Sequence, residues 1–363
     1  MTWRCKNCGF TWKFPVETCI KCNVGVEVYL PQNYVVKGIT EVLARSVEHN
    51  EVPYYVLLLE DNNGLLSLRK SFQKFEIGHE IAEVSVRVDL PKIGIVGTGV
   101  TGVGITQIAL MSGCKVVLCG RSENSLYSAV ERIEKALSKR LPMKKIKSMM
   151  DSITLTTNMS ELSDANIIIE AVPENIDVKH LVFKELDSIC NDYTILATNT
   201  SSISIDGIAK ATNHPERVIG MHFFNPIQKM RLVEIVLGSK TNQSTIEYTK
   251  KTAIVFNKTP VLVKNNPGFI VNRLLMLFLN EAVQLLEENL ATKEDIDTAI
   301  ELGLNHPMGP LKLLDLIGID IFHDIMANLR NYQPEKFSIP LIIREMKDNK
   351  KLGRKTREGF YSY

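Results

Sequence analysis

The chain has no long uncharged apolar run and no marked excess of either charge. Its 363 residues carry a formal net charge of +2 at pH 7, which gives no general reason to expect nucleic acid or a membrane surface as a partner. No window reaches the roughly 18 uncharged apolar residues of a membrane-spanning helix, and the first residues form no apolar signal segment. We therefore expect a cytoplasmic protein that does not enter a membrane.

The chain also lacks internal repeats, low-complexity tracts and long linkers. Its content of 45% hydrophobic and 23% charged residues is ordinary for a globular protein. The length is sufficient for about two or three domains with a large core.

Cysteine is scarce outside one cluster. The chain has seven cysteines, of which three are scattered through apolar segments and are expected to be small core residues: Cys114, Cys119 and Cys190. The other four form two Cys-x-x-Cys pairs: Cys5, Cys8, Cys19 and Cys22. Two such pairs can close a tetrahedral site of four thiolates with no open position. Residues 1–30 are therefore predicted to be a zinc ribbon with a structural metal, and a rubredoxin-like iron site is the alternative.

Short runs of β-forming residues follow, separated by turn signals such as Asp61-Asn62-Asn63-Gly64. The runs are residues 34–37, 39–45, 54–60, 64–68 and 80–88. This number of short strands predicts a small OB-like β-barrel over residues 31–89. An OB-type barrel can bind single-stranded nucleic acid through aromatic platforms in a basic groove. We assign four aromatic residues to core and ribbon packing instead: Trp3, Trp12, Tyr54 and Tyr55. Nucleic acid is therefore not the expected partner.

A strand-like run at residues 91–96 leads directly into Gly97-Thr98-Gly99-Val100-Thr101-Gly102 and then into a helical stretch. A second strand follows at residues 115–119, so the glycines stand in the context that a dinucleotide-binding motif requires. Gly97 permits the tight turn, Gly99 lets the backbone approach the pyrophosphate, and Gly102 lets the helix pack close to the strand. The pyrophosphate then meets the helix N-terminus. Residues 90–266 are therefore predicted to form a Rossmann-type α/β domain.

The end of the second strand indicates which dinucleotide is bound. An NAD site usually has a carboxylate here for the ribose 2′-hydroxyl, but this chain has Gly120-Arg121-Ser122. Arg121 can bind a 2′-phosphate with two hydrogen bonds, and Ser122 can add another. A lost neutral hydrogen bond is worth ~0.5–1.5 kcal/mol and one to a charged group ~1.5–3 kcal/mol. The balance favours NADP(H); in the alternative, Arg121 is a solvated surface residue and NAD is used.

Later strands, at residues 194–198 and 218–222, carry polar residues to the carboxyl edge of the predicted sheet, where such folds bind ligands. The first is followed by Asn199-Thr200-Ser201-Ser202, and the second ends at His222. Glu234 lies in the apolar run 232–236 and needs a partner if it is buried. His222 is the candidate, because an imidazole oriented by a carboxylate can act as a base near neutral pH. A purely structural buried pair is the alternative.

Residues 267–363 show helical patterns throughout, at 268–288, from Thr292 to 302, at 308–324 and at 339–347. Thr292, with Asp295 three residues later, is expected to be an N-cap. These residues are predicted to form an all-helical domain. The first helix contains more leucine than one face requires, so either a partner covers it or the leucines pack inside the monomer.

From about residue 91 to residue 363 the chain resembles the 3-hydroxyacyl-CoA dehydrogenase family, in particular bacterial-type 3-hydroxybutyryl-CoA dehydrogenases. The resemblance rests on the glycine-rich motif and on Glu174-Asn175, residues 199–202, residues 222–226 with 232–234, residues 267–273, residues 306–310, and residues 353–356 before 359–361. It implies a CoA-ester substrate of short chain length and a homodimer.

The resemblance also implies roles for single residues. His222 would exchange the proton of the 3-hydroxyl group, Glu234 would orient it, and Ser201 would bind the substrate oxygen. Asn272 would complete the catalytic set from the helical domain. The cofactor site would also contain Glu174, Lys179, Asn225 and Lys355. Gly120 stands where the family usually has an acidic residue, and Ala136 stands where a small polar residue often contacts CoA.

A basic cluster after residue 138 is expected either to be a solvated helix end or to receive the phosphates of CoA: Lys139, Arg140, Lys144, Lys145 and Lys147. Lys144 is the predicted substrate contact. The N-terminal segment resembles zinc-ribbon/OB-fold proteins that accompany acyl-CoA enzymes. That resemblance implies a second role for residues 1–89, as a binding unit for a partner acyl-CoA enzyme.

Overall fold

The computed structural model describes residues 2–5, 11–12, 26–29, 34–42, 54–61, 64, 66–71, 74–81, 90–139 and 141–363. The chain divides into two compact units, Met1–Leu90 and Pro91–Tyr363. In the described residues, no helix is long and apolar enough to cross a membrane.

In the residues that the structure describes, the first unit contains two antiparallel sheets. One has the order β2-β1-β3, with β1 at Thr2–Cys5, β2 at Thr11–Trp12 and β3 at Val26–Tyr29. The other has the order β6-β5-β4-β7, with β4 at Tyr34–Val42, β5 at Tyr54–Asp61, β6 at Leu66–Ser71 and β7 at Glu80–Ile81. Val36, Leu57 and Leu59 form the buried core of the second sheet.

Two predicted strands of this unit are one strand in the structure. The runs 34–37 and 39–45 were expected to be separate, but β4 continues through Gly38 with a register shift between Val36 and Gly38. A bulge at a glycine absorbs the extra residue without ending the strand. In the described residues no group of His, Cys, Asp and Glu side chains could hold a metal ion. Cys8, Cys19 and Cys22 lie outside those residues, so the zinc ribbon and the closed barrel stay predictions.

The second unit is built around an eight-stranded sheet of order β10-β9-β8-β11-β12-β13-β14-β15. Its strands are β8 Ile93–Val96, β9 Val116–Cys119, β10 Ile153–Thr156, β11 Ile167–Glu170, β12 Ile195–Thr198, β13 Val218–Phe223, β14 Leu232–Leu237 and β15 Thr259–Lys264. Neighbouring strands run parallel except β13 and β14, which are antiparallel. The central strands β8, β11 and β12 are buried over their whole length, and apolar residues predominate in them, because helices cover both faces of the sheet.

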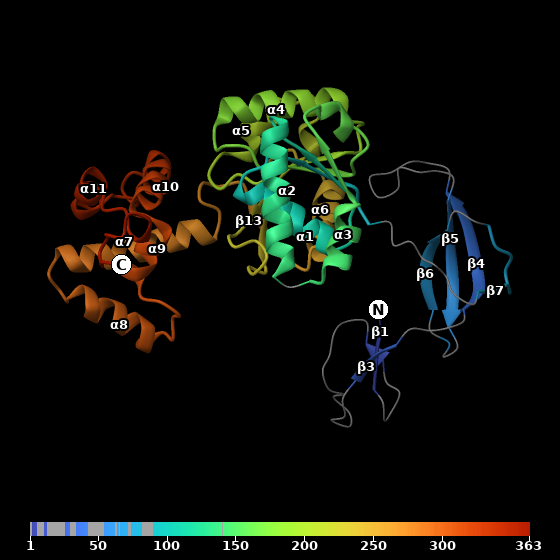
Figure 1. The fold of residues 1–363 in the computed structure, drawn as a ribbon, viewed down its shortest axis with the longest axis horizontal. Coiled ribbons are helices and arrows are strands. Elements are labelled where there is room, and N and C mark those ends of the chain that lie inside the picture. Colours follow the sequence, from blue (N-terminus) through green and yellow to red (C-terminus); the bar gives the residue numbers. More distant parts are fainter. Residues whose placement is uncertain are drawn as a thin grey trace. The chain divides into compact units, whose positions relative to one another are not determined.

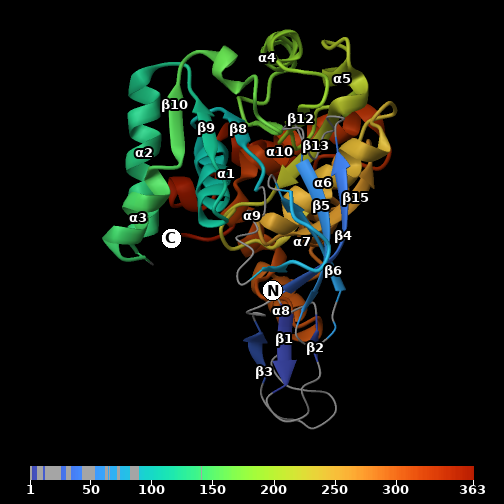
Figure 2. The same ribbon diagram turned by 90° about the vertical axis from the view of Figure 1, so that its right-hand side faces the viewer.

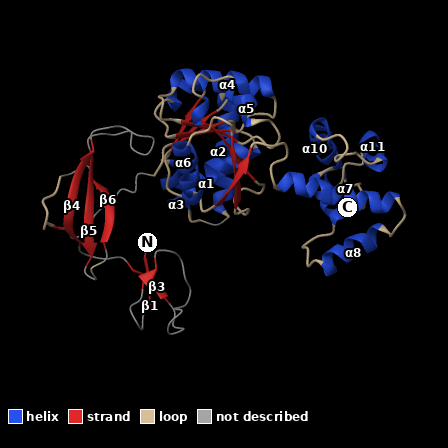
Figure 3. Cartoon of the chain, turned by 180° about the vertical axis from the view of Figure 1, so that it is seen from behind, coloured by secondary structure: helices blue, strands red, loops and turns tan. Residues whose placement is uncertain are grey.

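The helices of this α/β domain are α1 Val100–Met111, α2 Glu123–Ser138, α3 Met143–Met150, α4 Ile176–Ile189, α5 Ile205–Ala209 and α6 Gln243–Val255. Residues of α4 and α5 pack on one face of the sheet, where Phe183, Leu186 and Ile208 are buried among strand residues. Figures 1 and 3 show α1 and α6 on the opposite side of the sheet. Helix α2 lies beside β10, as Figure 2 shows. The predicted Rossmann-type domain is confirmed.

The helical part comprises α7 Val271–Glu287, α8 Lys293–Gly303, α9 Pro310–Ile317, α10 Ile319–Tyr332 and α11 Leu341–Asp348. Thr292 caps α8 as predicted, accepting a hydrogen bond from the N–H of Asp295. The single helical pattern expected at 308–324 is wrong. It is two helices, because Gly318 has a φ of +108° that breaks the helix at that point.

Candidate active site

The register of the parallel strands aligns their last residues in one row. Thr156, Cys119, Val96, Glu170 and Thr198 are paired in turn across β10, β9, β8, β11 and β12. The segments that follow these strands therefore leave the sheet at one edge, its carboxyl edge. The chain order reverses between β8 and β11, which is where doubly wound sheets bind their ligands.

The glycine-rich loop between β8 and α1 lies at this reversal point. Gly97 has a φ of +121°, and a Cβ there would lie 2.5 Å from the carbonyl oxygen of Ala171. A Cβ on Gly102 would clash with the carbonyl oxygen of Gly97, so only glycine lets α1 lie this close to the loop. Gly99 has open space where a Cβ would project, and no side chain caps α1. The open space and the N–H groups of the first helical turn fit a dinucleotide pyrophosphate.

Residues 120–122, which follow β9, include no carboxylate, and any side chain at Gly120 would require a neighbour to shift. Gly120 packs against α2, and a Cβ there would lie 2.8 Å from Cγ and Cδ2 of Leu126. Among the described residues, the exposed Arg121 has no hydrogen-bond or ion-pair partner. Ser122 is the N-cap of α2, and its hydroxyl accepts a hydrogen bond from the N–H of Ser125 at 3.4 Å. Arg121 is therefore available to a ligand, while Ser122 also serves the helix.

Arg132, which the sequence did not single out, also reaches the glycine-rich loop. Its guanidinium donates hydrogen bonds to the carbonyl oxygen of Thr98 and, from Nε at 3.1 Å, to that of Ser128. This contact joins α2 to the loop. No sequence signal could have identified it, because it depends on how α2 packs beside α1.

His222 and Glu234 form a buried hydrogen-bonded pair across two antiparallel strands. They stand directly opposite each other in β13 and β14, and His222 Nδ1 lies 2.8 Å from Glu234 Oε2. The rings of Phe224 and Phe269 lie 4.6 and 5.5 Å from the imidazole, centroid to centroid, and the histidine side chain is 8% exposed. With Nδ1 bound to the carboxylate, Nε2 is the nitrogen left to exchange a proton.

The second oxygen of Glu234 joins the sheet to the helical part. Its Oε1 accepts hydrogen bonds from the N–H groups of Ile270 and Val271, both at 3.0 Å, and Val271 begins α7. Burial raises the pKa of Glu234, but the hydrogen bonds from His222, Val271 and Ile270 outweigh burial and lower it below its ordinary value. The carboxylate is therefore ionised at neutral pH. Asn272 lies in the turn of α7 that this contact fixes.

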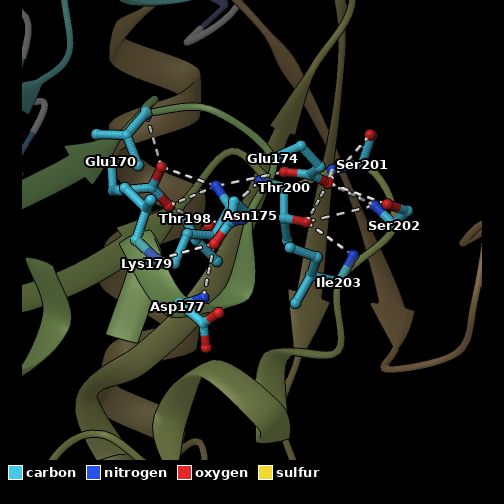
Figure 4. A network of polar contacts seen from close by, with 12 residues as sticks. Glu170, Glu174, Asn175, Asp177, Lys179, Thr198, Thr200, Ser201, Ser202 and Ile203 are labelled. Carbon is cyan, nitrogen blue, oxygen red and sulfur yellow. Dashed lines mark hydrogen bonds and ion pairs between the residues drawn. The ribbon is translucent and has the colours of Figure 1, made fainter. Parts of the chain in front are cut away.

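Residues 199–202, here called the serine loop, are bound by one carboxylate oxygen of Glu174 (Figure 4). Oε1 accepts hydrogen bonds from the Thr200 hydroxyl at 2.6 Å and from the N–H groups of Ser201 and Ser202 at 2.9 and 3.0 Å. The hydroxyls of Ser201 and Ser202 donate to the same oxygen over 3.3 and 3.1 Å. Burial raises the pKa of Glu174, but Lys179 and these hydrogen bonds outweigh burial and lower it.

Lys179 and Glu170 form a buried ion pair next to Glu174. Lys179 Nζ donates to both oxygens of Glu170, at 2.8 and 2.9 Å, and lies 3.3 Å from Glu174 Oε2. The side chains of Lys179 and Glu170 are 1% and 0% exposed. Glu170 also accepts hydrogen bonds from the Thr198 hydroxyl and the Val172 N–H, both at 2.7 Å. Glu170 was missed at the sequence level, although a carboxylate closing the apolar strand Ile167–Glu170 was a signal for it.

The other predicted cofactor and substrate residues lie apart from this network. Asn225 is exposed just after β13 and precedes Pro226 through a cis peptide bond. Lys144 is exposed on α3. Lys355 forms an ion pair with Asp320 in the helical part.

The helical part approaches the serine loop. A cleft of about 440 Å³ is lined by Ser201 and Ser202 on one side and by Ile325, Asn328 and Leu329 of α10 on the other. Within the described chain, no hydrogen bond joins His222 to Ser201 or to Asn272. The structure thus brings Ser201 together with Glu174, and His222 together with Glu234.

Comparisons with known proteins cover the second unit. Residues 92–266 match the family model for the 3-hydroxyacyl-CoA dehydrogenase NAD binding domain, and residues 268–363 match the model for the 3-hydroxyacyl-CoA dehydrogenase C-terminal domain. A 3-hydroxybutyryl-CoA dehydrogenase of Clostridioides difficile is 42% identical over 278 residues, which span 75% of this chain and 99% of the relative. The mitochondrial hydroxyacyl-coenzyme A dehydrogenase of Mus musculus is 38% identical over 76% of this chain and 92% of its own length.

A solved structure has the same fold over the same part of the chain. The (S)-3-hydroxybutyryl-CoA dehydrogenase of Ralstonia eutropha aligns with a TM-score of 0.73 and 38% identity, covering 75% of this chain and 99% of that chain. The two family models together account for both the sheet that carries the glycine-rich loop and the helices that follow it. From residue 92 to residue 363, the chain belongs to the 3-hydroxyacyl-CoA dehydrogenase family.

Proposed function

We propose that the protein interconverts short-chain 3-hydroxyacyl-CoA and 3-oxoacyl-CoA thioesters, with 3-hydroxybutyryl-CoA as the expected substrate. The observation that carries the proposal is the His222–Glu234 pair, a buried and oriented imidazole on the sheet whose carboxyl edge also carries the glycine-rich loop. Membership of the family supports the same reaction, and relatives at 42% and 40% identity are named as a 3-hydroxybutyryl-CoA dehydrogenase and a probable one.

His222 handles the proton in this reaction. A bound nicotinamide supplies the hydride acceptor for C3 in the oxidative direction and the hydride donor in the reductive one. His222 Nε2 takes the proton of the 3-hydroxyl group in oxidation and returns it to the carbonyl oxygen in reduction. Glu234 holds the Nδ1–H and balances the charge of the imidazolium. A base in this role contributes typically ~10²–10⁴-fold.

Two further residues bind the substrate oxygen in this proposal. Ser201 donates a hydrogen bond to it from the serine loop, and Asn272 adds a polar contact from the first turn of α7. Orientation of the reacting carbon accounts for the rest of the acceleration. Turnover of a panel of 3-oxoacyl-CoA esters tests the reaction: reduction of acetoacetyl-CoA is expected, and no reduction of any member would refute it.

We propose NADP(H) as the cofactor, with NAD(H) as the alternative. The support is local. Gly120 offers no acceptor for a ribose hydroxyl, and a side chain there would require Leu126 to shift. Arg121 is exposed and unpaired among the described residues. Losing one hydrogen bond from Arg121 to a phosphate costs ~1.5–3 kcal/mol. Arg121→Ala should therefore lower kcat/KM for NADPH roughly 10- to 100-fold and leave that for NADH nearly unchanged. A wild type that prefers NADH would refute this assignment.

We propose that Lys144 binds a phosphate of CoA. It lies on α3 within the predicted basic cluster, and the described lysines of this cluster are exposed. Lys144→Ala should raise KM for acetoacetyl-CoA but not for acetoacetyl-N-acetylcysteamine, a thioester that lacks the phosphates. Equal effects on both thioesters would contradict the assignment.

For residues 1–89 we propose a structural zinc ribbon followed by an OB-like barrel that docks a partner acyl-CoA enzyme. Metal analysis of the full chain should find about one zinc per chain, and Cys19→Ser should lose it. A chain without residues 1–89 should keep its turnover and lose its associations; unchanged associations would remove the support for docking.

We also propose a homodimer through the helical part. Leu274 on α7 is 65% exposed although the helix is rich in leucine, so a second subunit would cover it. Light scattering should show twice the mass of the chain. A monomer at micromolar concentration would contradict the proposal.

A further inference from the structure

Lys258 is a buried lysine that forms no ion pair with a carboxylate in the described part of the chain. It is 8% exposed and lies directly before β15. Its Nζ donates hydrogen bonds to two backbone carbonyl oxygens, those of Ile227 and Met230, the second at 2.7 Å. Burial lowers the pKa of the ammonium group below its ordinary value. Lysine is almost never buried without a charged partner, so this contact with an uncharged loop points to a specific task.

The two carbonyl groups belong to the segment that follows β13. Residues 224–231, here called the 224–231 loop, join β13 to β14. The carbonyl oxygen of Pro226 accepts hydrogen bonds from the N–H groups of Lys229 and Met230 at 2.9 and 3.0 Å, so the loop contains one helix-like turn. A cation is favourably placed near the last carbonyl groups of such a turn. Lys258 therefore binds this loop through the backbone of the turn.

The same loop packs against α1, the helix that begins at the glycine-rich loop. Ile227 is buried, and a Cβ on Gly104 would lie 2.9 Å from its Cδ1, so the loop contacts the helix directly. Gln228 Nε2 also donates a hydrogen bond to Gln107 Oε1 at 2.6 Å. The 224–231 loop is thus bound both by Lys258 and by the helix whose N-terminus fits the dinucleotide pyrophosphate.

Asn225 is a residue of this loop whose side chain is available to a ligand. It is exposed three residues after His222, and its amide forms no hydrogen bond with the described residues. The amide offers two donors and one acceptor oxygen. Because no side-chain contact in the described structure holds it, the backbone of the loop sets its position.

We propose that Lys258 is a positioning residue: it holds the 224–231 loop by two backbone carbonyl groups and thereby keeps the Asn225 amide in place to bind the dinucleotide. This inference rests on the proposed function, which requires a bound dinucleotide, and adds to it a residue that acts through the loop. Small movements of the loop matter, because a misplacement of about 1 Å can cost on the order of 10²-fold in turnover.

The test removes the hydrogen-bond donors of Lys258. Lys258→Met keeps an unbranched side chain of similar length without any N–H group. The matched control is Lys264→Met, which replaces an exposed lysine at the end of β15. For each full-length protein, Kd for NADPH and NADH is measured by fluorescence, and kcat and KM are measured for acetoacetyl-CoA reduction. The dinucleotide Kd needs no turnover, so it tests this inference separately from the proposed reaction.

The expected effect is on the dinucleotide and not on the CoA ester. In Lys258→Met, Kd for the dinucleotide that the wild type prefers rises about 2- to 10-fold, the effect of one lost hydrogen bond from the Asn225 amide. Turnover falls about 10- to 100-fold, while KM for acetoacetyl-CoA stays within about two-fold. The control matches the wild type. In an Asn225→Ala background, Lys258→Met raises the dinucleotide Kd by less than about two-fold, because both residues act through one amide.

Other results would overturn the inference. A dinucleotide Kd for Lys258→Met within about two-fold of the wild type, whatever the thermal stability, would show that Lys258 only stabilises the fold. An equal rise in Kd with and without the Asn225 side chain would show that Lys258 does not act through Asn225. If Lys258→Met does not fold, Lys258→Gln, with its shorter side chain, is measured with the same expectations, and failure of both to fold would show a structural role only.

Failure of the proposed function gives a different result. A wild type that binds a dinucleotide but reduces no CoA ester would refute the proposed reaction, while the Kd values of the variants still decide the role of Lys258. A wild type that binds neither NADPH nor NADH would overturn both.

Discussion

Replacing Glu234 by glutamine should trap His222 in the wrong tautomer. The substitution keeps the size of the side chain but leaves one acceptor oxygen and one NH₂ group in place of two acceptor oxygens. In the wild type, Oε1 accepts the N–H groups of Ile270 and Val271 at 3.0 Å and Oε2 binds His222 Nδ1 at 2.8 Å. Glutamine cannot supply an oxygen on both sides.

The two backbone N–H groups decide which way the glutamine amide turns. If its oxygen faces Ile270 and Val271, both hydrogen bonds survive and the NH₂ group faces His222. In the opposite orientation two buried N–H groups lose their acceptor, at a cost of about 1–3 kcal/mol each. The first orientation is therefore favoured by at least about 2 kcal/mol, or roughly thirty-fold in population. It requires Nδ1 to be an acceptor, so the proton moves to Nε2.

A proton on Nε2 removes the base from the reaction. The neutral histidine can no longer accept the 3-hydroxyl proton, so kcat for oxidation should fall on the order of 10²–10⁴-fold. A tautomer error of this kind costs about 10⁴-fold in the serine-protease triad. The dinucleotide does not touch Glu234 in this proposal, and its Kd should stay close to the wild-type value.

The assay is oxidation of 3-hydroxybutyryl-CoA, combined with ¹⁵N chemical shifts of labelled histidine to assign the protonated nitrogen. The matched control is Glu247→Gln on α6, which changes a partly exposed ion pair with Lys250 and should leave turnover unchanged. A kcat for Glu234→Gln within a few-fold of the wild type, or a proton that stays on Nδ1 of His222 in that variant, would refute the predicted change of tautomer.

Three further predictions follow from the same site. His222→Ala should lower turnover about 10²–10⁴-fold with dinucleotide Kd nearly intact; turnover within a few-fold in a coupled assay would show that another group handles the proton. Gly102→Ala puts a methyl group against the carbonyl oxygen of Gly97 and should cost about 1–3 kcal/mol of unfolding free energy in urea, with weaker dinucleotide binding by calorimetry; unchanged binding would contradict it. Because the folded-state pKa of Glu234 is lowered from 4.5, the stability contributed by its ionisation is present above pH 4.5 and lost as pH falls through the lower folded value. The difference in unfolding free energy between wild type and Glu234→Gln should therefore shrink below pH 4.5, and a constant difference would argue against a lowered pKa.

Local patterns predicted most elements of the second unit. The strands expected at residues 115–119 and 194–198 match β9 and β12 to within one residue. Apolar runs this short, bounded by polar residues, leave a buried strand as the simplest solution. The failures came where one residue changes the backbone path without changing the apolar pattern. Gly318 splits one expected helix, and Gly38 joins two expected strands through a bulge.

The residues of the candidate site were also predictable only in part. His222 and Glu234 could be paired from the sequence because a charged residue in an apolar strand needs a partner, and strand pairing then placed them opposite each other. Arg132 could not be found, because its contact with Thr98 depends on the packing of α2. Lys179 was expected from family resemblance to be a cofactor residue. Its near-complete burial between two carboxylates became visible only with the structure.

The sequence by itself determined the class of the protein: a glycine-rich loop between a strand and a helix, a histidine at a strand end, and a helical domain after them. These features depend on residues close together in the chain, where backbone geometry and hydrophobic periodicity act directly. Only the tertiary structure decided how Glu170, Lys179 and Glu174 share their charges and hold the serine loop. A buried charge is tolerated only with its partners in place, and these partners come from β11, β12, α4 and the loops between them.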